Sequence, residues 1–135
     1  MQITAKVTSS PNVYHASVST GDSSRSLAIE PKSDGCGSSV NGGEFLMLAL
    51  ATCYCNDLYR EAKRIGILIE GADVEASAEF VGIGLAAKCI SYRAHVRSPA
   101  PAADVRRLLR ETDAVAEIHN TIRAGVPVHL VEDFE

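Results

Sequence analysis

The longest uninterrupted pattern in the chain runs from Asn41 to Gly66. Apolar residues dominate from Phe45 to Cys55, whereas charged and apolar residues are mixed from there to the end of the stretch. Strong helix formers supply most positions, and about 24 helical residues would span roughly 36 Å. The pattern therefore predicts one long helix that is buried on all sides in its first half and on one side in its second half.

Signals at both ends of this stretch support the helix. Asn41 can cap its first turn, and Glu44, three residues later, completes a spacing like that of a capping box. Glu44 also places a negative charge at the positive end of the helix dipole. Gly66 is the expected C-cap.

Alternating apolar and polar residues predict strands on both sides of the helix. Residues 2–8 and 13–18 form a predicted hairpin through a turn at 9–12, and after a turn at 21–24 a short third strand contains Leu27 and Ile29. A second hairpin follows the helix, with inward-facing apolar positions at 74–80 and 90–96 and a turn at 82–84. In its second strand, we expect one set of residues to face outward or into a site: Cys89, Ser91, Arg93, His95 and Arg97.

The last third of the chain predicts two helices and a strand. Apolar residues spaced for one helical face predict a short helix over 104–110. Thr112 and Asp113 can cap a further helix that ends at Gly125, and residues 126–130 alternate as a final strand. The resulting order is βββ–α–ββ–αα–β in a single domain over 1–135, which places the fold in the α+β class.

Composition narrows the function classes. Hydrophobic residues make up 46% of the 135 residues, enough for a packed core. The net charge is −4 and no basic cluster exceeds Arg106-Arg107, so we expect no nucleic-acid partner. The most apolar run is about half as long as the roughly 20 residues that a membrane helix needs. The N-terminal residues have no apolar region typical of a signal peptide, and we expect a cytoplasmic protein without a membrane partner.

Four cysteines carry the candidate chemistry. Without a secretory signal, structural disulfides are not expected, and the spacings match no metal or cofactor motif. Cys53 and Cys55 lie roughly 200° apart around a helix and so point to nearly opposite faces. Each can be a buried apolar residue. Alternatively Cys53, at the boundary between the apolar and the mixed half, is a reactive thiol.

The start of the long helix resembles a motif of the OsmC/Ohr family of thiol peroxidases. That motif runs Asn-Pro-Glu, a Leu/Ala-rich turn, then Ala-Cys; the matching residues are Asn41-Gly42-Gly43-Glu44, FLMLALA and Thr52-Cys53, with the same separation from Asn to Cys. The segments Ile29-Glu30-Pro31 and Gly35-Cys36-Gly37 are similar to the family's strand and Gly-rich loop, and the predicted order of elements is similar over essentially the whole chain.

The resemblance implies an intertwined homodimer with active sites at the subunit interface. It implies that Cys53 is the peroxidatic cysteine, which attacks the O–O bond of a hydroperoxide and becomes a sulfenic acid. In the family a second cysteine, in a Cys-Pro pair on the later helix, resolves this acid to a disulfide that dithiols reduce.

The chain departs from the family pattern at three places. His119-Asn120 stand where the family has Cys-Pro, so the resolving cysteine is missing. The family's glutamate falls on Gly43, with Glu44 one position away. The family's arginine lies in the turn of the first hairpin, where this chain has none, and Arg25 lies beyond the second strand.

The candidate catalytic residues are therefore Cys53, which the resemblance implies, and Glu44 and His119, which lie beside or at the departures. His119 can stabilise a thiolate as an imidazolium, and Cys36 or Cys89 can replace the resolving cysteine. We expect the other histidines to be polar surface or interface residues: His15, His95 and His129.

Three functional hypotheses follow. The leading one is a thiol-dependent peroxidase that reduces organic hydroperoxides through Cys53 and is regenerated by an external thiol. The alternative is a related protein without peroxidase activity that binds a small apolar or acyl ligand at the dimer interface. The third is a dimeric scaffold without a pocket.

Overall fold

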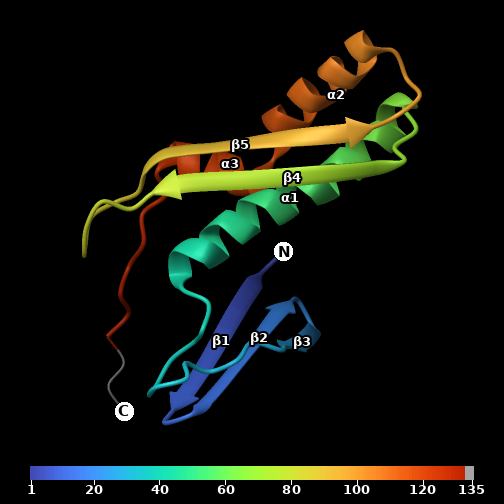
Figure 1. Ribbon diagram of the computed structural model, residues 1–135. Coiled ribbons are helices and arrows are strands. Elements are labelled where there is room, and N and C mark those ends of the chain that lie inside the picture. Colours follow the sequence, from blue (N-terminus) through green and yellow to red (C-terminus); the bar gives the residue numbers. More distant parts are fainter. Residues whose placement is uncertain (133–135) are drawn as a thin grey trace. The chain divides into compact units, whose positions relative to one another are not determined.

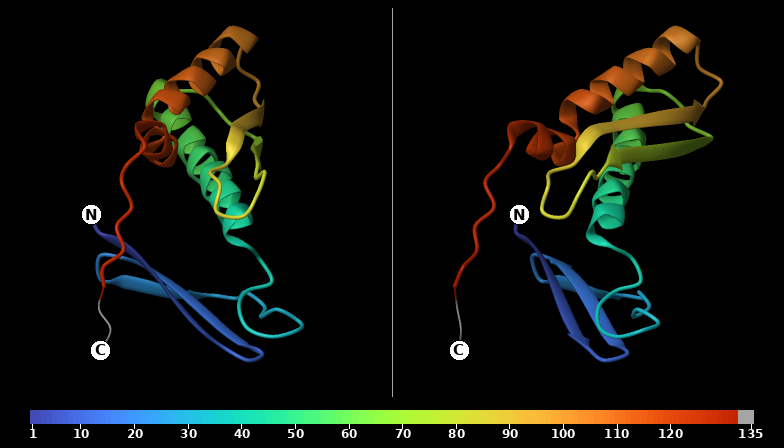
Figure 2. Two further views of the ribbon diagram at one scale, coloured as in Figure 1. Left: turned by 90° about the vertical axis from the view of Figure 1, so that its left-hand side faces the viewer. Right: turned by 60° about the vertical axis from the view of Figure 1, so that its left-hand side comes forward.

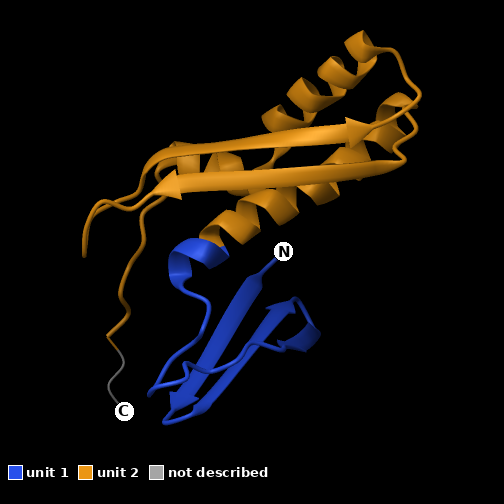
Figure 3. Cartoon of the chain, in the orientation of Figure 1, with its two compact units in different colours: residues 1–45 blue, residues 46–135 orange. Residues whose placement is uncertain are grey.

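The computed structural model describes residues 1–132, and the chain forms two compact units that divide between Phe45 and Leu46 (Figure 3). Helices and strands follow in the order βββ–α–ββ–αα (Figure 1). The strands are grouped in antiparallel hairpins and meanders apart from the helices, which confirms the α+β class.

The first unit holds a three-stranded antiparallel sheet. Its strands are β1 (Ile3–Ser10), β2 (Val13–Thr20) and β3 (Ser23–Leu27), in the order β1-β2-β3. Both connections are two-residue turns, and Asn12 (φ 60°) and Gly21 (φ 55°) adopt the left-handed conformation that such turns use. The prediction for the third strand was wrong in position, because the tight turn at Gly21 lets the strand start at Ser23 and leaves Ile29 outside it.

The long helix is α1 (Gly42–Ile65), with the ends that the sequence predicts. The Asn41 side chain accepts a hydrogen bond from the Glu44 backbone N–H (2.9 Å), and the Glu44 carboxylate accepts one from the Asn41 N–H (2.8 Å). This reciprocal pair is a capping box. At the other end, Gly66 takes φ 76° and the Ile67 N–H bonds the Ala62 carbonyl (2.8 Å), which closes the last turn.

The predicted burial along α1 was wrong. Its first half leaves Leu48 59% exposed, whereas the second half carries the most buried residues, including Leu58 (0% exposed). Asp57 and Glu61 are also buried, although both are acidic. The reason is that the sheet and helices of the second unit pack around the second half of α1, so apolar composition alone does not locate the core.

The second unit packs α1 and two further helices on one face of a hairpin (Figure 2). The hairpin consists of β4 (Gly71–Glu79) and β5 (Lys88–Arg97), and the helices are α2 (Ala102–Val115) and α3 (Glu117–Ala124). The core is a cluster of Tyr54, Leu58, Ala62, Leu108 and Ala116. The outer face of the hairpin carries cross-strand ion pairs, Arg93 with Glu75 and Arg97 with Asp73, so the prediction that these arginines face outward is confirmed.

Two predictions for the last third of the chain were wrong. Thr112 and Asp113 lie inside α2 rather than at a cap, since α2 extends five residues past the predicted end at 110 and breaks only at Ala116 (φ −72°, ψ 104°). Gly125 ends α3 with φ 60°, as predicted. Residues 126–130 form no strand: Val128 is 97% exposed, and no strand within residues 1–132 pairs with this segment.

No helix within residues 1–132 has the length and apolar character that crossing a membrane requires.

Candidate functional site

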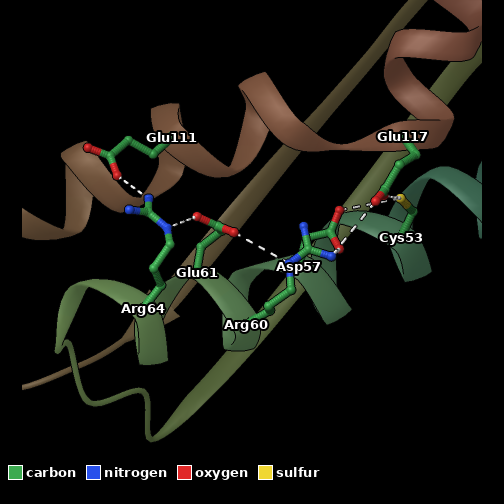
Figure 4. A network of polar contacts seen from close by, with 7 residues as sticks. All are labelled: Cys53, Asp57, Arg60, Glu61, Arg64, Glu111 and Glu117. Carbon is green, nitrogen blue, oxygen red and sulfur yellow. Dashed lines mark hydrogen bonds and ion pairs between the residues drawn. The ribbon is translucent and has the colours of Figure 1, made fainter.

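The Cys53 thiol lies between α1 and the start of α3 (Figure 4). Its S–H donates to Oδ2 of Asp57 at 3.6 Å, and Oε2 of Glu117 lies 3.9 Å from the sulfur. Asp57 is four residues after Cys53 and therefore lies on the same face of α1. Glu117 is the first residue of α3, so the break at Ala116 brings a second carboxylate to the thiol.

Arg60 balances part of this negative charge. Its Nη1 lies 2.8 Å from Oδ1 of Asp57 and 3.9 Å from Oε1 of Glu117. Asp57 is only 5% exposed, and a buried carboxylate needs such a partner to stay ionised. The two carboxylates thus lie between one cation and one thiol, and we call these four residues the Cys53 cluster: Cys53, Asp57, Arg60 and Glu117.

The surroundings of Cys53 raise the pKa of its thiol. Burial is the largest cause, and the charges of Asp57 and Glu117 add to it, while the Ile118 backbone N–H at the start of α3 opposes it. Burial likewise raises the pKa of Asp57, against the lowering effect of Arg60. The thiol is therefore mostly protonated near neutral pH, and Asp57 is placed to accept its proton.

The same atoms have the spacing of a possible metal site. Cys53, Asp57 and Glu117 each offer one ligand atom, and these atoms lie within 4.8 Å of one another. However, the Arg60 guanidinium already supplies positive charge to both carboxylates. The arrangement therefore fits proton transfer at a thiol better than a metal centre.

A row of ion pairs on the same side of α1 fixes this helix against α2 (Figure 4). Arg64 bridges Glu61 (2.6 Å) on α1 and Glu111 (2.5 Å) on α2, and these contacts lower the pKa of both carboxyl groups. Glu61 is 6% exposed, so its pairing with Arg64 satisfies a buried charge. The row positions the segment of α1 that follows Cys53.

His119 lies in the core rather than at the thiol. Its ring centroid is 4.4 Å from that of Tyr92 and 5.8 Å from that of Tyr54, and the residue is 3% exposed. Burial lowers its pKa, as does the charge of Arg123, so the ring is neutral near pH 7. Within residues 1–132 neither ring nitrogen has a hydrogen-bond partner, and hence none joins it to Cys53.

The other candidate residues lie elsewhere. Glu44 forms the capping box, and its nine-residue separation from Cys53 corresponds to about 13.5 Å along a helix. All four cysteines are free thiols; Cys36 and Cys89 are exposed. Cys89 has φ 53°, an unusual backbone conformation for a residue with a side chain.

Three residues of the Cys53 cluster, Asp57, Arg60 and Glu117, were not predicted from the sequence. Asp57 and Arg60 follow Cys53 at i+4 and i+7, a spacing that places all three on one helical face. That signal was present in the sequence. The contribution of Glu117 was not visible, because it depends on where α3 begins.

Comparison with known protein families and solved structures identifies proteins that are similar to this chain. The profile of the OsmC family, described as OsmC-like protein, matches residues 35–131. The chain belongs to the OsmC family. The match covers α1, the Cys53 cluster and all later helices and strands, so the family resemblance seen at the start of α1 is confirmed. No curated protein sequence matches the chain.

Solved structures of OsmC proteins share the fold at low sequence identity. One is an organic hydroperoxide resistance protein OsmC from Legionella pneumophila, with 18% identity, 91% of this chain and 90% of that chain covered, and a TM-score of 0.62. An OsmC-like protein from Mycoplasma pneumoniae has 18% identity over 90% and 86% of the two chains (TM-score 0.60). An organic hydroperoxide resistance protein from Elizabethkingia anophelis has 15% identity over 91% and 89% (TM-score 0.63).

Proposed function

We propose that this protein is a one-cysteine peroxidase that reduces organic hydroperoxides through Cys53 with an external thiol as reductant. The observation that carries the proposal is the hydrogen bond from the Cys53 S–H to the Asp57 carboxylate, both of which belong to α1. Family membership supports the same chemistry, since two of the similar structures are described as organic hydroperoxide resistance proteins.

In the proposed first step, Asp57 accepts the thiol proton and the Cys53 thiolate attacks one oxygen of the hydroperoxide ROOH. The S–O bond forms as the O–O bond breaks, which leaves the cysteine as sulfenic acid and releases RO⁻. The proton held by Asp57 then goes to RO⁻ and gives the alcohol. One oxygen and two electrons have thus passed between sulfur and peroxide.

An external thiol R′SH completes the cycle. It attacks the sulfenic sulfur, releases water and forms a mixed disulfide with Cys53. A second R′SH cleaves this disulfide, which restores the Cys53 thiol and releases R′SSR′. Because His119 stands where the family has its resolving cysteine, we assign resolution to the external thiol rather than to Cys36 or Cys89.

Three groups support the thiolate in this scheme. The Ile118 backbone N–H and the positive end of α3 stabilise negative charge on the sulfur. Arg60 acts indirectly, because it pairs with Asp57 and offsets the negative charge beside the sulfur. His119 does not stabilise the thiolate in this scheme, because it lies in the core and burial lowers its pKa.

We also propose that the protein acts as a homodimer. The sheet β1–β3 contains apolar positions such as Ile3 (64% exposed) and Val7 (55% exposed), and its own unit has no helix beyond the first turn of α1 to cover them. A second copy can cover this sheet. Because Glu44 lies about 13.5 Å along the helix from Cys53, any contribution of Glu44 to the site comes from that second copy.

The test is oxidation of the reduced protein with one equivalent of cumene hydroperoxide, followed by mapping of each cysteine by mass spectrometry. Cys53 is expected to be trapped by dimedone as sulfenic acid, and Cys53→Ala is expected to lose turnover with an external thiol. Cys55→Ala is the matched control, since it removes a thiol from another face of the same helix. Equal oxidation of Cys53 and Cys89 would refute the proposal.

The raised pKa of Cys53 favours a second candidate function. A thiol that stays protonated is a poor nucleophile, and a family member without peroxidase activity can still bind a small apolar or acyl ligand at a dimer interface. If this second function is correct, the Cys53→Ala variant should still bind the ligand. The ligand should also raise the melting temperature of the protein without consuming its thiols.

A further inference from the structure

The row of ion pairs that includes the Cys53 cluster carries one excess negative charge. Within residues 1–132 the row joins four carboxylates to three guanidinium groups: Asp57, Glu61, Glu111 and Glu117 with Arg60, Arg64 and Arg107. Hydrogen bonds from arginine side chains lower the pKa values of Glu61 and Glu111, so both are ionised near neutral pH. With all four carboxylates ionised, the net charge beside the neutral Cys53 thiol is minus one.

Glu117 holds this excess charge. Among contacts within residues 1–132, its carboxylate lies 3.9 Å from the nearest guanidinium, whereas each of the other three carboxylates has a guanidinium nitrogen within 2.8 Å. The guanidinium near Glu117 belongs to Arg60, which also contacts Asp57 and Glu61 and is therefore shared. The Glu117 side chain is 69% exposed, against 32% or less for the other three.

Glu117 also lies on the solvent side of the Cys53 sulfur. Its Oε2 is 3.9 Å from the sulfur in an exposed contact, whereas the Asp57 carboxylate on the other side is buried (Figure 4). A molecule that reaches the sulfur from solvent therefore meets the charge of Glu117 first. Salt screens this charge only partly, because the distance is shorter than the Debye length of about 8 Å at physiological ionic strength.

We propose that Glu117 selects the molecules that react with Cys53 by their charge, and that it makes a small aminothiol the external reductant. An ammonium group two carbons from the attacking sulfur is attracted to the Glu117 carboxylate, whereas a carboxylate at the same place is repelled. A thiol attacks as its thiolate, so the ammonium group also offsets the negative charge that the thiolate brings. The choice of reductant rests on the proposed peroxidase cycle, whereas charge selection at the Cys53 thiol does not.

The first test compares two methanethiosulfonates of similar size and opposite charge, in a variant whose other three cysteines are replaced by serine. One carries a trimethylammonium-ethyl group and the other a sulfonatoethyl group. In both reactions the Cys53 thiolate displaces methanesulfinate and forms a disulfide. A unit charge about 6 to 8 Å from the charge of the reagent changes each rate about two- to threefold in water. The ratio of the cationic to the anionic rate should therefore be about five- to tenfold higher at Cys53 than at free 2-mercaptoethanol.

Three variants, made in the same background, assign the selection to Glu117. Glu117→Gln removes the charge and should bring the ratio close to that of the free thiol. The ratio is unaffected by a change in the pKa of Cys53, because both reagents react with the same thiolate. Glu117→Asp keeps the charge and should keep most of the selection. Glu75→Gln is the matched control, since it removes a similarly exposed carboxylate from the ion pair with Arg93 and should leave the ratio unchanged.

Salt gives a measurement that needs no substitution at Glu117. At about 1 M NaCl the Debye length is about 3 Å, so the ratio at Cys53 should fall towards that of the free thiol. A purely steric preference for one reagent would not respond in this way.

Peroxide turnover then tests the reductant. Cysteamine, 2-mercaptoethanol and 3-mercaptopropionate share the frame HS–CH₂–CH₂ and end in an ammonium, a hydroxyl and a carboxylate group. With cumene hydroperoxide as substrate, the preference in kcat/KM for cysteamine over 3-mercaptopropionate should be about five- to tenfold greater in the wild-type protein than in Glu117→Gln. Comparing the two proteins cancels the different intrinsic reactivities of the thiols.

Several results would overturn the proposal. A ratio of methanethiosulfonate rates at Cys53 equal to that of the free thiol would do so, as would a ratio that Glu117→Gln or salt leaves unchanged. Turnover in which Glu117→Gln keeps the wild-type preference among the three thiols would overturn the choice of reductant. If no thiol supports turnover while the two methanethiosulfonates still differ at Cys53, the peroxidase cycle is refuted and charge selection by Glu117 is confirmed.

Discussion

Replacing Asp57 by Asn should lower the pKa of the Cys53 thiol. Asp57 accepts the thiol's hydrogen bond at 3.6 Å, and its charge is one of the causes that raise this pKa. Two unit charges 3.6 Å apart interact by about 1 kcal/mol in water and by about 5 kcal/mol at an effective dielectric constant of 20. Because Cys53 is only half-buried and Arg60 neutralises part of the Asp57 charge, we expect the lower end of this range. One kcal/mol corresponds to about 0.7 pKa units.

The assay is the pH dependence of iodoacetamide alkylation in a Cys36→Ser, Cys55→Ser, Cys89→Ser background, where Cys53 is the only thiol. Asp57→Asn should shift the midpoint down by roughly 0.7 to 1 units and speed alkylation at pH 7 by about five- to tenfold. Glu117→Gln should shift it in the same direction by less, since this carboxylate lies farther from the sulfur (3.9 Å) and is 69% exposed. Asp73→Asn, on the outer face of the hairpin, is the control without effect.

An unchanged or raised midpoint in Asp57→Asn would refute the reasoning, because it would mean that burial alone sets the pKa of Cys53. The peroxidase assay on the same variant gives an independent result. Alkylation needs only the thiolate, whereas peroxide reduction in the proposed mechanism also needs Asp57 to return the proton to RO⁻. Faster alkylation combined with slower peroxide turnover would therefore identify Asp57 as the proton carrier.

Three further predictions concern stability. Asn41→Ala removes half of the capping box and should lower the free energy of unfolding by about 1 kcal/mol in urea titrations, with Asn56→Ala on the exposed side of α1 as control. Thr112→Val should leave stability unchanged or raise it by up to about 1 kcal/mol, because the buried Thr112 hydroxyl has no partner within residues 1–132; a loss of more than 1 kcal/mol would contradict this. Burial raises the pKa of Tyr54 to about 12 from 10.0, so its neutral form stabilises the fold fully below pH 10, and this contribution is lost as the pH rises from 10 towards 12. Tyr54→Phe should show a smaller loss over that window in pH-dependent thermal melts.

The long helix was predictable from sequence because its signals are local. Asn41 and Glu44 are three residues apart, and their reciprocal hydrogen bonds depend on no other part of the chain. Gly66 ends the helix for an equally local reason, its left-handed φ of 76°. The two hairpins were predictable from the alternation of apolar and polar residues along each strand. This alternation is also a local signal, because successive residues of a strand face opposite sides of the sheet.

Features that depend on distant contacts were not predictable. The apolar first half of α1 suggested the core, yet the core lies around Leu58, where β4, β5 and α2 supply the covering side chains. The alternating residues 126–130 satisfy the pattern of a strand, but a strand also requires a neighbour for its backbone, and within residues 1–132 none pairs with it. Thr112 resembled a cap because its type favours caps, while the helix continues past it and buries its side chain.

The charges of the Cys53 cluster explain why a family member without the usual arginine still has a candidate active site. With Asp57 and Glu117 ionised, Arg60 leaves the cluster with one net negative charge around a neutral thiol. Loss of the Cys53 proton to solvent would raise the net negative charge of the cluster to two. If the proton moves to Asp57 instead, the net charge stays the same. In the proposed mechanism, transfer of the thiol proton to Asp57 therefore forms the thiolate without adding charge to the cluster. The proposed mechanism therefore assigns to Asp57, rather than to an arginine, the proton transfer on which peroxide reduction depends.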